Sequence, residues 1–281
     1  MREINSEAII NAVEKLCLQA ACYLPSDVKK ALNQGYEQES CALAKDFFAQ
    51  YLENSSISEK EHLPICQDTG FAVFFVERGE DTKVVGANLR DAITIGAEAG
   101  YKNYYLRKSI VTDPLFKRKN TFTNTPVIIH EKTVPGNQIK ITLAPKGGGS
   151  ENMSALKMLK PSDGRKGVVD FVVDTIVNAG GNPCPPTVVG VGIGGTMEYA
   201  AFLAKKALLR PIGSVHSDPE YAELEAEILA KINNSGVGAQ GLGGDITSLA
   251  VHIEWHPCHL ASLPVAVNPN CHAARHADVI L

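Results

Sequence analysis

The stretch Thr187-Val-Val-Gly-Val-Gly-Ile-Gly-Gly195 decides the fold class of this chain. Its β-branched residues up to Val191 predict a buried strand, and the glycines that follow predict a turn. The run Met197–Leu209 then repeats apolar residues at helical spacing and predicts a helix. A strand that passes through a turn into a helix is typical of folds that combine both kinds of element.

The same patterns continue on both sides of this stretch. Further helices are predicted near residues 9–20, from a cap at Ser26 onward, and at 39–54, 88–105, 165–178 and 219–233. Further strands are predicted at residues 71–76, 126–130, 138–144, 246–255 and 262–267. The mixed order predicts an α/β (mixed α+β) fold, with residues 1–281 as a single domain that divides into subdomains near residues 145–165.

Composition narrows the class of protein. With 281 residues, of which 44% are hydrophobic, the chain can bury a large core without disulfides. A formal net charge of −4 argues against nucleic acid or an anionic membrane as the main partner. The sequence contains no secretory signal pattern and no apolar run of about 18 residues that could span a membrane. We therefore expect a cytoplasmic protein whose seven cysteines are not joined in disulfides.

Six of the seven cysteines fall into two groups. Cys17, Cys22 and Cys41 lie within helical patterns, where a small buried side chain is expected. Cys66, Cys184 and Cys271 lie among proline, glycine and asparagine, which fix a loop and present the thiol. Their wide separation excludes the paired Cys-x-x-Cys knuckles of zinc sites and small ferredoxins. They are either separate thiols, or ligands of one cubane cluster whose fourth iron is left open as a Lewis acid for dehydration.

Several segments together resemble a known family. They are Ile65-Cys-Gln-Asp-Thr-Gly70, Lys146-Gly-Gly-Gly-Ser-Glu-Asn152, Gly181-Asn-Pro-Cys-Pro-Pro186, Gly192-Ile-Gly-Gly195, His256-Pro-Cys-His-Leu-Ala-Ser-Leu-Pro264 and Asn270-Cys-His-Ala-Ala-Arg275. In this order, over about residues 60–281, they resemble the cluster-binding half of class I fumarate hydratases and L(+)-tartrate dehydratase.

The resemblance implies a set of site residues around a central iron–sulfur cluster between two α/β subdomains. It implies that a [4Fe–4S] cluster is bound by Cys66, Cys184 and Cys271. It implies that the substrate is contacted by Gln67, Asp68, Arg107 and the backbone of Gly148. It implies that Asp68 and His259 are catalytic.

The implied activity is that of a hydro-lyase. The resemblance implies reversible hydration of fumarate to (S)-malate, with dehydration of L(+)-tartrate to oxaloacetate as the alternative. Single-chain members of the family continue into a second domain, whereas this sequence ends at Leu281. A separate β subunit is therefore expected to supply the general base, in an α2β2 assembly.

Other interpretations of the residues stay open. Asp68 could only close a turn, Arg107 could only favour a helix end, and His259 could be one of several structural histidines. Gly190-Val-Gly-Ile-Gly-Gly195 formally matches a dinucleotide-binding fingerprint, although no acidic residue follows at the end of a second strand. A zinc or non-haem iron hydrolase would use His252, His256 and His259. A scaffold subunit would use none of these groups.

Overall fold

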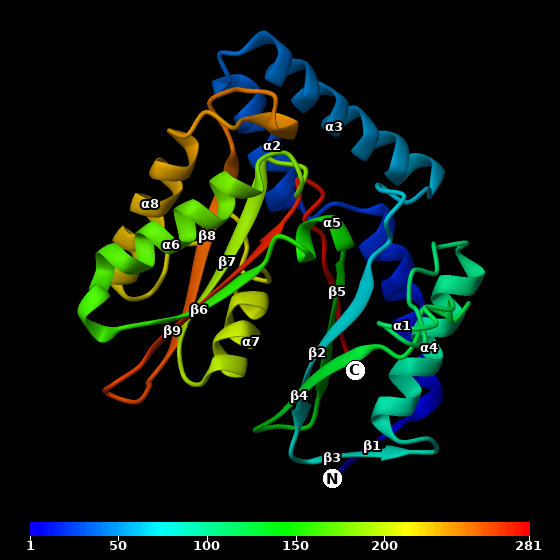
Figure 1. The fold of residues 1–281 in the computed structure, drawn as a ribbon. Helices are drawn as coiled ribbons and strands as arrows, with labels where there is room; N and C mark the ends of the chain where they lie inside the picture. Colours follow the sequence, from blue (N-terminus) through cyan, green and yellow to red (C-terminus); the bar gives the residue numbers. More distant parts are fainter. The chain divides into compact units, whose positions relative to one another are not determined.

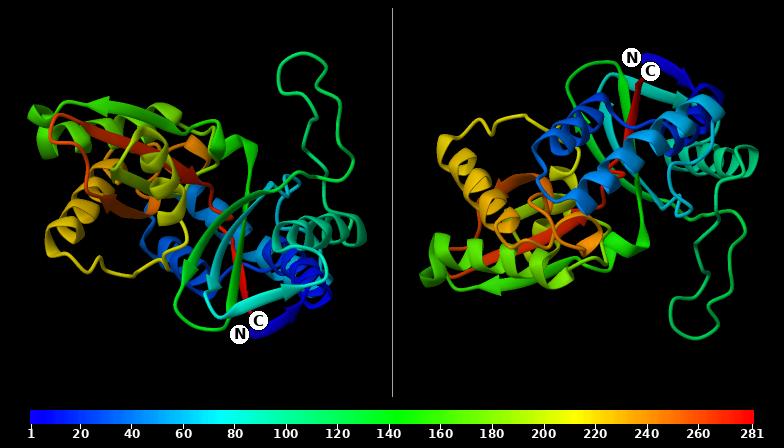
Figure 2. Two further views of the ribbon diagram at one scale, coloured as in Figure 1. Left: turned by 90° about the horizontal axis from the view of Figure 1, so that it is seen from below. Right: turned by 90° about the horizontal axis from the view of Figure 1, so that it is seen from above.

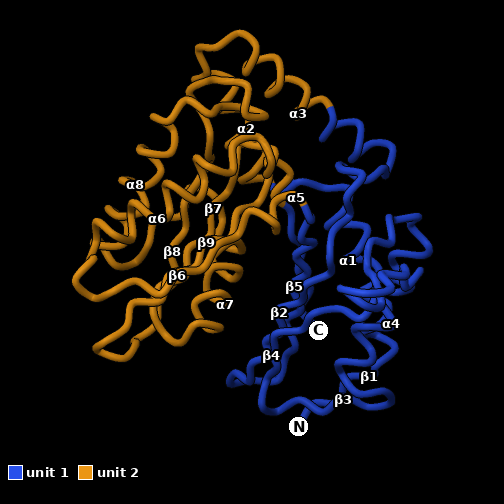
Figure 3. Tube along the Cα trace, in the orientation of Figure 1, with its two compact units in different colours: residues 1–25, 54–148, 275–281 blue, residues 26–53, 149–274 orange.

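The computed structural model describes residues 1–281 and contains helices and strands in mixed order, which confirms the predicted mixed α/β fold. The chain divides into two compact units (Figure 3). Unit 1 comprises residues 1–25, 54–148 and 275–281, and unit 2 comprises residues 26–53 and 149–274. One boundary between the units, after Gly148, lies within residues 145–165. That residues 1–281 form a single catalytic domain stays a prediction.

Unit 1 is built on a four-stranded sheet of order β10-β5-β2-β4, in which β2 and β4 are parallel and the other neighbours antiparallel (Figure 1). Its strands are β2 (Phe71–Gly79), β4 (Ile128–Val134), β5 (Ile139–Lys146) and β10 (Ala277–Ile280). A separate parallel pair is formed by β1 (Arg2–Asn5) and β3 (Thr82–Val85). The helices are α1 (Ser6–Cys22) and α4 (Leu89–Asn103).

The core of unit 1 lies between its helices and the four-stranded sheet. The fully buried residues Ile9, Val13 and Leu16 recur along one face of α1, as the helical pattern predicted. The helix α4 approaches α1 closely, because a Cβ at Gly96 would lie 2.6 Å from the carbonyl oxygen of Ile10. Residues 104–127, between α4 and β4, form a long loop that projects from this unit (Figure 2).

Unit 2 is built on a sheet of order β6-β9-β7-β8, in which only β7 and β8 are parallel. Its strands are β6 (Ala155–Leu159), β7 (Thr187–Gly194), β8 (Ser248–His256) and β9 (Leu263–Asn270). Its helices are α2 (Ser26–Gln38), α6 (Gly164–Ala179), α7 (Met197–Ala207) and α8 (Pro219–Asn233). Two helices cross between the units, namely α3 (Ala42–Glu61) and the short α5 (Gly148–Glu151).

The central strand β7 explains why the stretch from Thr187 to Gly195 is so rich in valine and glycine. Every residue of β7 is buried. Val189, Val191 and Ile193 point into the core that contains α6 and α8. Gly190 and Gly192 face α7 instead, where a Cβ would lie 2.1 and 2.0 Å from the carbonyl oxygens of Ala204 and Ala200. The glycines therefore let α7 lie directly on the sheet.

Most predicted elements are confirmed, with shifted ends. The helix predicted at residues 39–54 is α3, which begins at Ala42, so Cys41 lies before the helix and is only half-buried. The strands β1, β3, β6 and β10 were not predicted. Each has four or five residues and pairs with a single neighbour, so it needs no strict alternation of apolar residues. None of the helices is both long and apolar enough to cross a membrane.

Candidate active site

The loop that precedes β2 brings a thiol, an amide and a carboxylate together in unit 1. Asp68 Oδ1 accepts a hydrogen bond from Gly70 N (3.0 Å), and Oδ2 accepts one from Gly148 N (2.7 Å). The Asp68 N–H points to Cys66 Sγ at 3.4 Å, and this thiol lies 3.4 Å from Gln67 Oε1. Asp68 therefore does close a turn, and it also links the cysteine loop to the triple-glycine loop.

The same loop is locked onto the end of β5. Gly70 adopts a φ of +80°, and a Cβ there would lie 2.8 Å from Lys146 N. From the other side, Arg275 Nη2 donates to the carbonyl oxygen of Asp68 at 2.7 Å. Arg275 is buried, and its Nε has no hydrogen-bond partner. Sequence reasoning did not single out Arg275, because only the fold places this residue beside Asp68.

Arg107 lies at the start of the projecting loop and next to the Asp68 turn. Its carbonyl oxygen accepts a hydrogen bond from Thr69 Oγ1 at 3.0 Å, while its side chain is exposed. The buried Asn124 steadies this part of the loop, since its Nδ2 donates to Gly70 O (3.1 Å) and its Oδ1 accepts from Ser109 N (2.8 Å). Unit 1 thus collects Cys66, Gln67, Asp68, Gly148 and the backbone of Arg107.

Unit 2 brings Cys184 and Cys271 together at one end of its sheet. Cys184 lies just before β7 and Cys271 just after β9, and these antiparallel strands pair Val188 with Asn270 at that end. His272 N and Nδ1 lie 3.2 and 3.0 Å from the carbonyl oxygen of Cys184. The two cysteine loops are therefore tied directly to each other.

Tyr51 of α3 is a second residue at this end that sequence reasoning missed. Its ring stacks on His272 at 3.9 Å between centroids, and its hydroxyl donates to Pro185 O at 3.3 Å. Burial raises the pKa of Tyr51 to about 12, and the nearby Cys184 and Cys271 add to that rise. In the sequence, Tyr51 is one more aromatic residue in a helical pattern, so no local signal marks it.

His259 lies at the end of the unit 2 sheet opposite Cys184 and Cys271, and its catalytic role stays a prediction. It is exposed in the turn between β8 and β9, where it accepts a hydrogen bond from Ala261 N at 3.2 Å. That turn is at the end of the sheet where Gly194 pairs with His256. The strands β7 and β9 run from there to the cysteine loops at the opposite end.

The histidine-metal alternative is not supported. His252 is buried within β8, and burial, with the charge of Arg210, lowers its pKa to about 4. His256 ends the same strand and contacts Tyr199 edge-on. No three side chains of His, Cys, Asp or Glu gather closely enough to hold a single metal ion.

The dinucleotide-binding alternative is contradicted by the position of Gly190 and Gly192. Gly190 and Gly192 lie inside β7 and face α7, so they do not form a loop that could approach a pyrophosphate. In the sheet of unit 2 only β8 is parallel to β7, and the acidic residue of β8, Glu254, accepts a hydrogen bond from Lys206 Nζ of α7 at 2.8 Å. The fingerprint match reflects close packing of a helix on a strand.

Cysteines that bind an iron–sulfur cluster must be accessible and able to form thiolates, and the cysteines of this chain differ in both properties. No cysteine forms a disulfide. Cys17 is buried, and burial raises its pKa to about 12, which disfavours the thiolate that binds metal. Cys66 in unit 1, and Cys184 and Cys271 in unit 2, are exposed or half-buried on loops. Since each cysteine of a cluster binds a different iron, these three need not meet at one point, and their chemistry fits the group.

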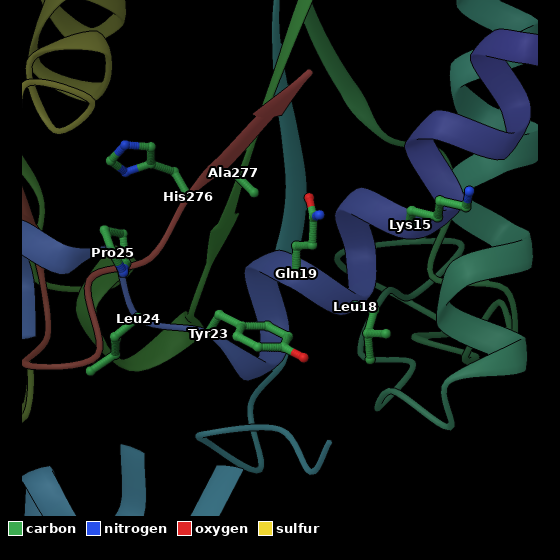
Figure 4. A pocket seen from close by; sticks show the side chains of 8 residues that line it. All are labelled: Lys15, Leu18, Gln19, Tyr23, Leu24, Pro25, His276 and Ala277. Carbon is green, nitrogen blue, oxygen red and sulfur yellow. The ribbon is translucent and has the colours of Figure 1, made fainter. Parts of the chain in front are cut away.

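A cavity of about 470 Å³ in unit 1 contains none of the predicted site residues (Figure 4). Its lining is largely apolar and includes Leu18, Leu24 and Pro25. Lys15 and His276, which could carry positive charge, lie at opposite sides of this lining and do not converge (Figure 4). The cavity therefore lacks the convergent polar groups of a dicarboxylate site.

A family model described as "Fumarate hydratase (Fumerase)" matches residues 10–280. The chain belongs to this fumarate hydratase family. "Putative L(+)-tartrate dehydratase subunit alpha" of Methanocaldococcus jannaschii is 47% identical over 274 residues, which are 96% of each chain. "L(+)-tartrate dehydratase subunit alpha" of Escherichia coli strain UTI89 is 33% identical over 291 residues, with 99% of this chain and 96% of the relative covered. The same-named protein of strain K12 is 32% identical over 287 residues, with 100% of this chain and 94% of the relative covered.

These matches confirm the resemblance that the sequence motifs indicated. Members of the fumarate hydratase family and the named dehydratases are hydro-lyases, so the matches support that class of enzyme for this chain.

Proposed function

We propose that this chain is the α subunit of a hydro-lyase that reversibly hydrates fumarate to (S)-malate. The observation that carries the proposal is the loop Cys66–Gly70, which combines a half-buried thiol with a carboxylate held by Gly148 N–H. Family membership over residues 10–280 supports the reaction class. The relatives' names contain the words "subunit alpha", which supports a separate β subunit, and we propose that the two assemble as α2β2.

We assign a [4Fe–4S] cluster to Cys66, Cys184 and Cys271. When bound, the cluster supplies a Lewis acid through the one iron that has no cysteine ligand. The loops of this chain supply thiols that are not buried and a backbone that holds them in place. The Cys184 carbonyl oxygen, for example, accepts two hydrogen bonds from His272.

The other residues of the loop region are assigned to the substrate. The exposed Arg107 has a planar fork of donors that suits a carboxylate, and Gln67 offers an amide next to the cysteine. Asp68 is fixed by donors at both oxygens, so it can receive or return a proton at a defined place. The Gly148 N–H holds Asp68, and the backbone of Gly148 is also assigned to the substrate. A general base from the β subunit completes the elimination.

His259 keeps only a predicted role. Its position between β8 and β9 lies at the opposite end of unit 2 from Cys184 and Cys271. A catalytic contribution from His259 would therefore have to act at a place other than the cysteine end of this unit.

Dehydration of L(+)-tartrate to oxaloacetate is the second candidate. The names of the relatives favour it, since all three describe an L(+)-tartrate dehydratase subunit. Both substrates are four-carbon dicarboxylic acids, so Arg107 and the cluster would serve either one. Contacts to the second hydroxyl of tartrate would separate the two activities.

The experiment is anaerobic purification of the chain with its β subunit, followed by reconstitution with iron and sulfide. We expect about four irons and four sulfides per αβ pair, and turnover of fumarate, L(+)-tartrate or both. Cys184→Ser should lose cluster and turnover together. Cys17→Ser is the matched control and should retain both, because Cys17 is a buried thiol of the core. Bound zinc, no metal, or equal damage in the two variants would overturn the proposal.

A further inference from the structure

One residue joins the two cysteine loops of unit 2, and the proposed reaction does not use it. His272 follows Cys271 in the chain, and its N–H and ring Nδ1 lie 3.2 and 3.0 Å from the Cys184 carbonyl oxygen. A carbonyl oxygen can only accept hydrogen bonds, so Nδ1 carries a proton here. His272 thereby fixes the backbone of Cys184 relative to that of Cys271.

The backbone at Cys184 requires such support. Its φ of +54° lies in the left-handed region, which is unfavourable for a residue with a side chain. The next carbonyl group, that of Pro185, is also bound, since it accepts from Tyr51 Oη at 3.3 Å and from Gln240 N at 3.0 Å. The carbonyl groups of Cys184 and of the next residue, Pro185, are therefore both fixed by hydrogen bonds.

Tyr51 connects these two points of attachment. Its ring lies flat on the His272 ring, with centroids 3.9 Å apart and planes 15° apart. Its hydroxyl donates to Pro185 O and accepts from Gln240 Nε2 at 2.7 Å. Tyr51 is 8% exposed, so the ring and the hydroxyl are held in place by the residues around them.

We propose that Tyr51 and His272 form a positioning pair that holds the thiols of Cys184 and Cys271 in the arrangement that an iron–sulfur cluster requires. This inference rests on the proposed function, because it assumes that the two thiols bind a cluster. Tyr51 acts through His272: the stacked ring restricts the imidazole to the orientation in which Nδ1–H meets the Cys184 carbonyl oxygen. Neither residue needs to touch the substrate.

The pair has a matched counterpart at the other end of the same sheet. Tyr199 contacts His256 edge-on at 4.9 Å between centroids, where β7 and β8 end. Removing the Tyr199 ring also breaks one tyrosine–histidine contact, but this contact does not involve the cysteine loops. Tyr199→Leu is therefore the control for Tyr51→Leu.

The test uses the anaerobically reconstituted αβ holoenzyme and measures the rate at which a chelator removes iron. We expect Tyr51→Leu and His272→Ala each to lose iron about tenfold faster than wild type, with altered electron paramagnetic resonance of the reduced cluster. Tyr51→Phe keeps the stacked ring, and Gln240 N still binds the Pro185 carbonyl oxygen, so this variant should stay within about twofold of wild type. The double variant Tyr51→Leu/His272→Ala should be no worse than His272→Ala, because Tyr51 acts through His272.

A second measurement does not depend on the cluster. In the metal-free chain, amide hydrogen exchange should show that His272→Ala loses protection in residues 181–186 and 268–273 together, whereas Tyr199→Leu loses it in neither. Normal iron retention in Tyr51→Leu and His272→Ala, or additive effects in the double variant, would overturn the pair while leaving the cluster in place. Absence of a cluster in wild type would instead overturn the proposed function, and the inference with it.

Discussion

Asp68 combines two roles at the scale of a single residue. Each of its carboxylate oxygens accepts a backbone N–H, one from Gly70 and one from Gly148. In Asp68→Asn an amide NH₂ must face one of these donors, so one hydrogen bond is lost and the charge is removed. We expect turnover to fall about 100-fold or more while the iron and sulfide content stays at the wild-type value.

The matched control for this change is Asp170→Asn, which removes a surface carboxylate that pairs with Lys166. Its turnover should equal that of wild type, since exposed ion pairs contribute little. If Asp68→Asn kept more than half of the wild-type turnover with a full cluster, Asp68 would be only the residue that closes the turn.

His252 makes the stability of unit 2 depend on pH. Its pKa is lowered from 6.5 to about 4, first by burial and then by Arg210, while Asp27 and Glu254 oppose the shift. Between these values the unfolded chain binds a proton that the folded chain does not, so stability is lost as the pH falls from 6.5 to 4. We expect a loss of about 3 kcal/mol across this window.

Trp255, the single tryptophan, lies on the same strand and reports unfolding of unit 2 by fluorescence. Urea unfolding at pH values between 4 and 7 should show a shallower pH dependence in His252→Leu than in wild type. His259→Leu, at an exposed position, should keep the wild-type dependence. An unchanged slope in His252→Leu would assign the acid sensitivity to other groups.

The site residues divide into those that carry a local signal and those that do not. Cys66, Cys184 and Cys271 stand among turn-forming residues, so the sequence distinguishes them from Cys17 in a helical pattern. Tyr51, Gln240 and Arg275 become part of the site only through long-range contacts, such as the bond from Arg275 to the carbonyl of Asp68. Sequence patterns contain no record of such contacts.

The same distinction applies at the scale of elements. The central strands β7 and β9 and the edge strand β8 are rich in apolar residues because most of their residues are buried, and the sequence predicted all three. The edge strand β6 has the sequence Ala-Leu-Lys-Met-Leu and only one buried residue, so its pattern is indistinct. Predicting β6 would have required knowledge of its partner β9.

The glycines of β7 set the distance between that strand and α7. A Cβ at Gly192 would lie 2.0 Å from the carbonyl oxygen of Ala200, so Gly192→Ala must push the helix away from the sheet. We expect a loss of about 3 kcal/mol in unfolding free energy, measured by urea unfolding with Trp255 fluorescence. Ala201→Leu adds bulk on the exposed side of α7 and should change the free energy by less than about 0.5 kcal/mol. Equal effects would mean that α7 tolerates displacement.

At the scale of the whole molecule, each unit is made of segments that are separated in the sequence. Unit 2 consists of residues 26–53 and 149–274, so a segment from early in the sequence must be attached to a much later one. Unit 1 is likewise closed by the last residues of the chain, where β10 pairs with β5. Such long-range closure cannot be seen in local periodicity, although the glycine-rich stretch near Gly148 marked one boundary.

Glu39 is one of the residues that join the two segments of unit 2. It is 3% exposed, and its carboxylate accepts hydrogen bonds from Cys41 N (2.9 Å), Asp245 N (3.0 Å) and Ile246 N (3.2 Å). In Glu39→Ala these backbone donors lose their acceptor in a buried place, so we expect unit 2 to lose about 3 kcal/mol of unfolding free energy.

The control is Glu37→Ala, which removes an exposed carboxylate from the end of α2, two residues before Glu39, and should change the free energy by less than about 0.5 kcal/mol. Urea unfolding followed by Trp255 fluorescence measures both variants, because Trp255 lies in the later segment and Glu39 in the earlier one. A normal midpoint in Glu39→Ala would show that the other contacts of residues 26–53, such as those of Asp27 and Tyr51, are enough to attach this segment. A lowered midpoint would show that the buried Glu39 carboxylate is needed for the early segment to complete the unit that carries Cys184 and Cys271.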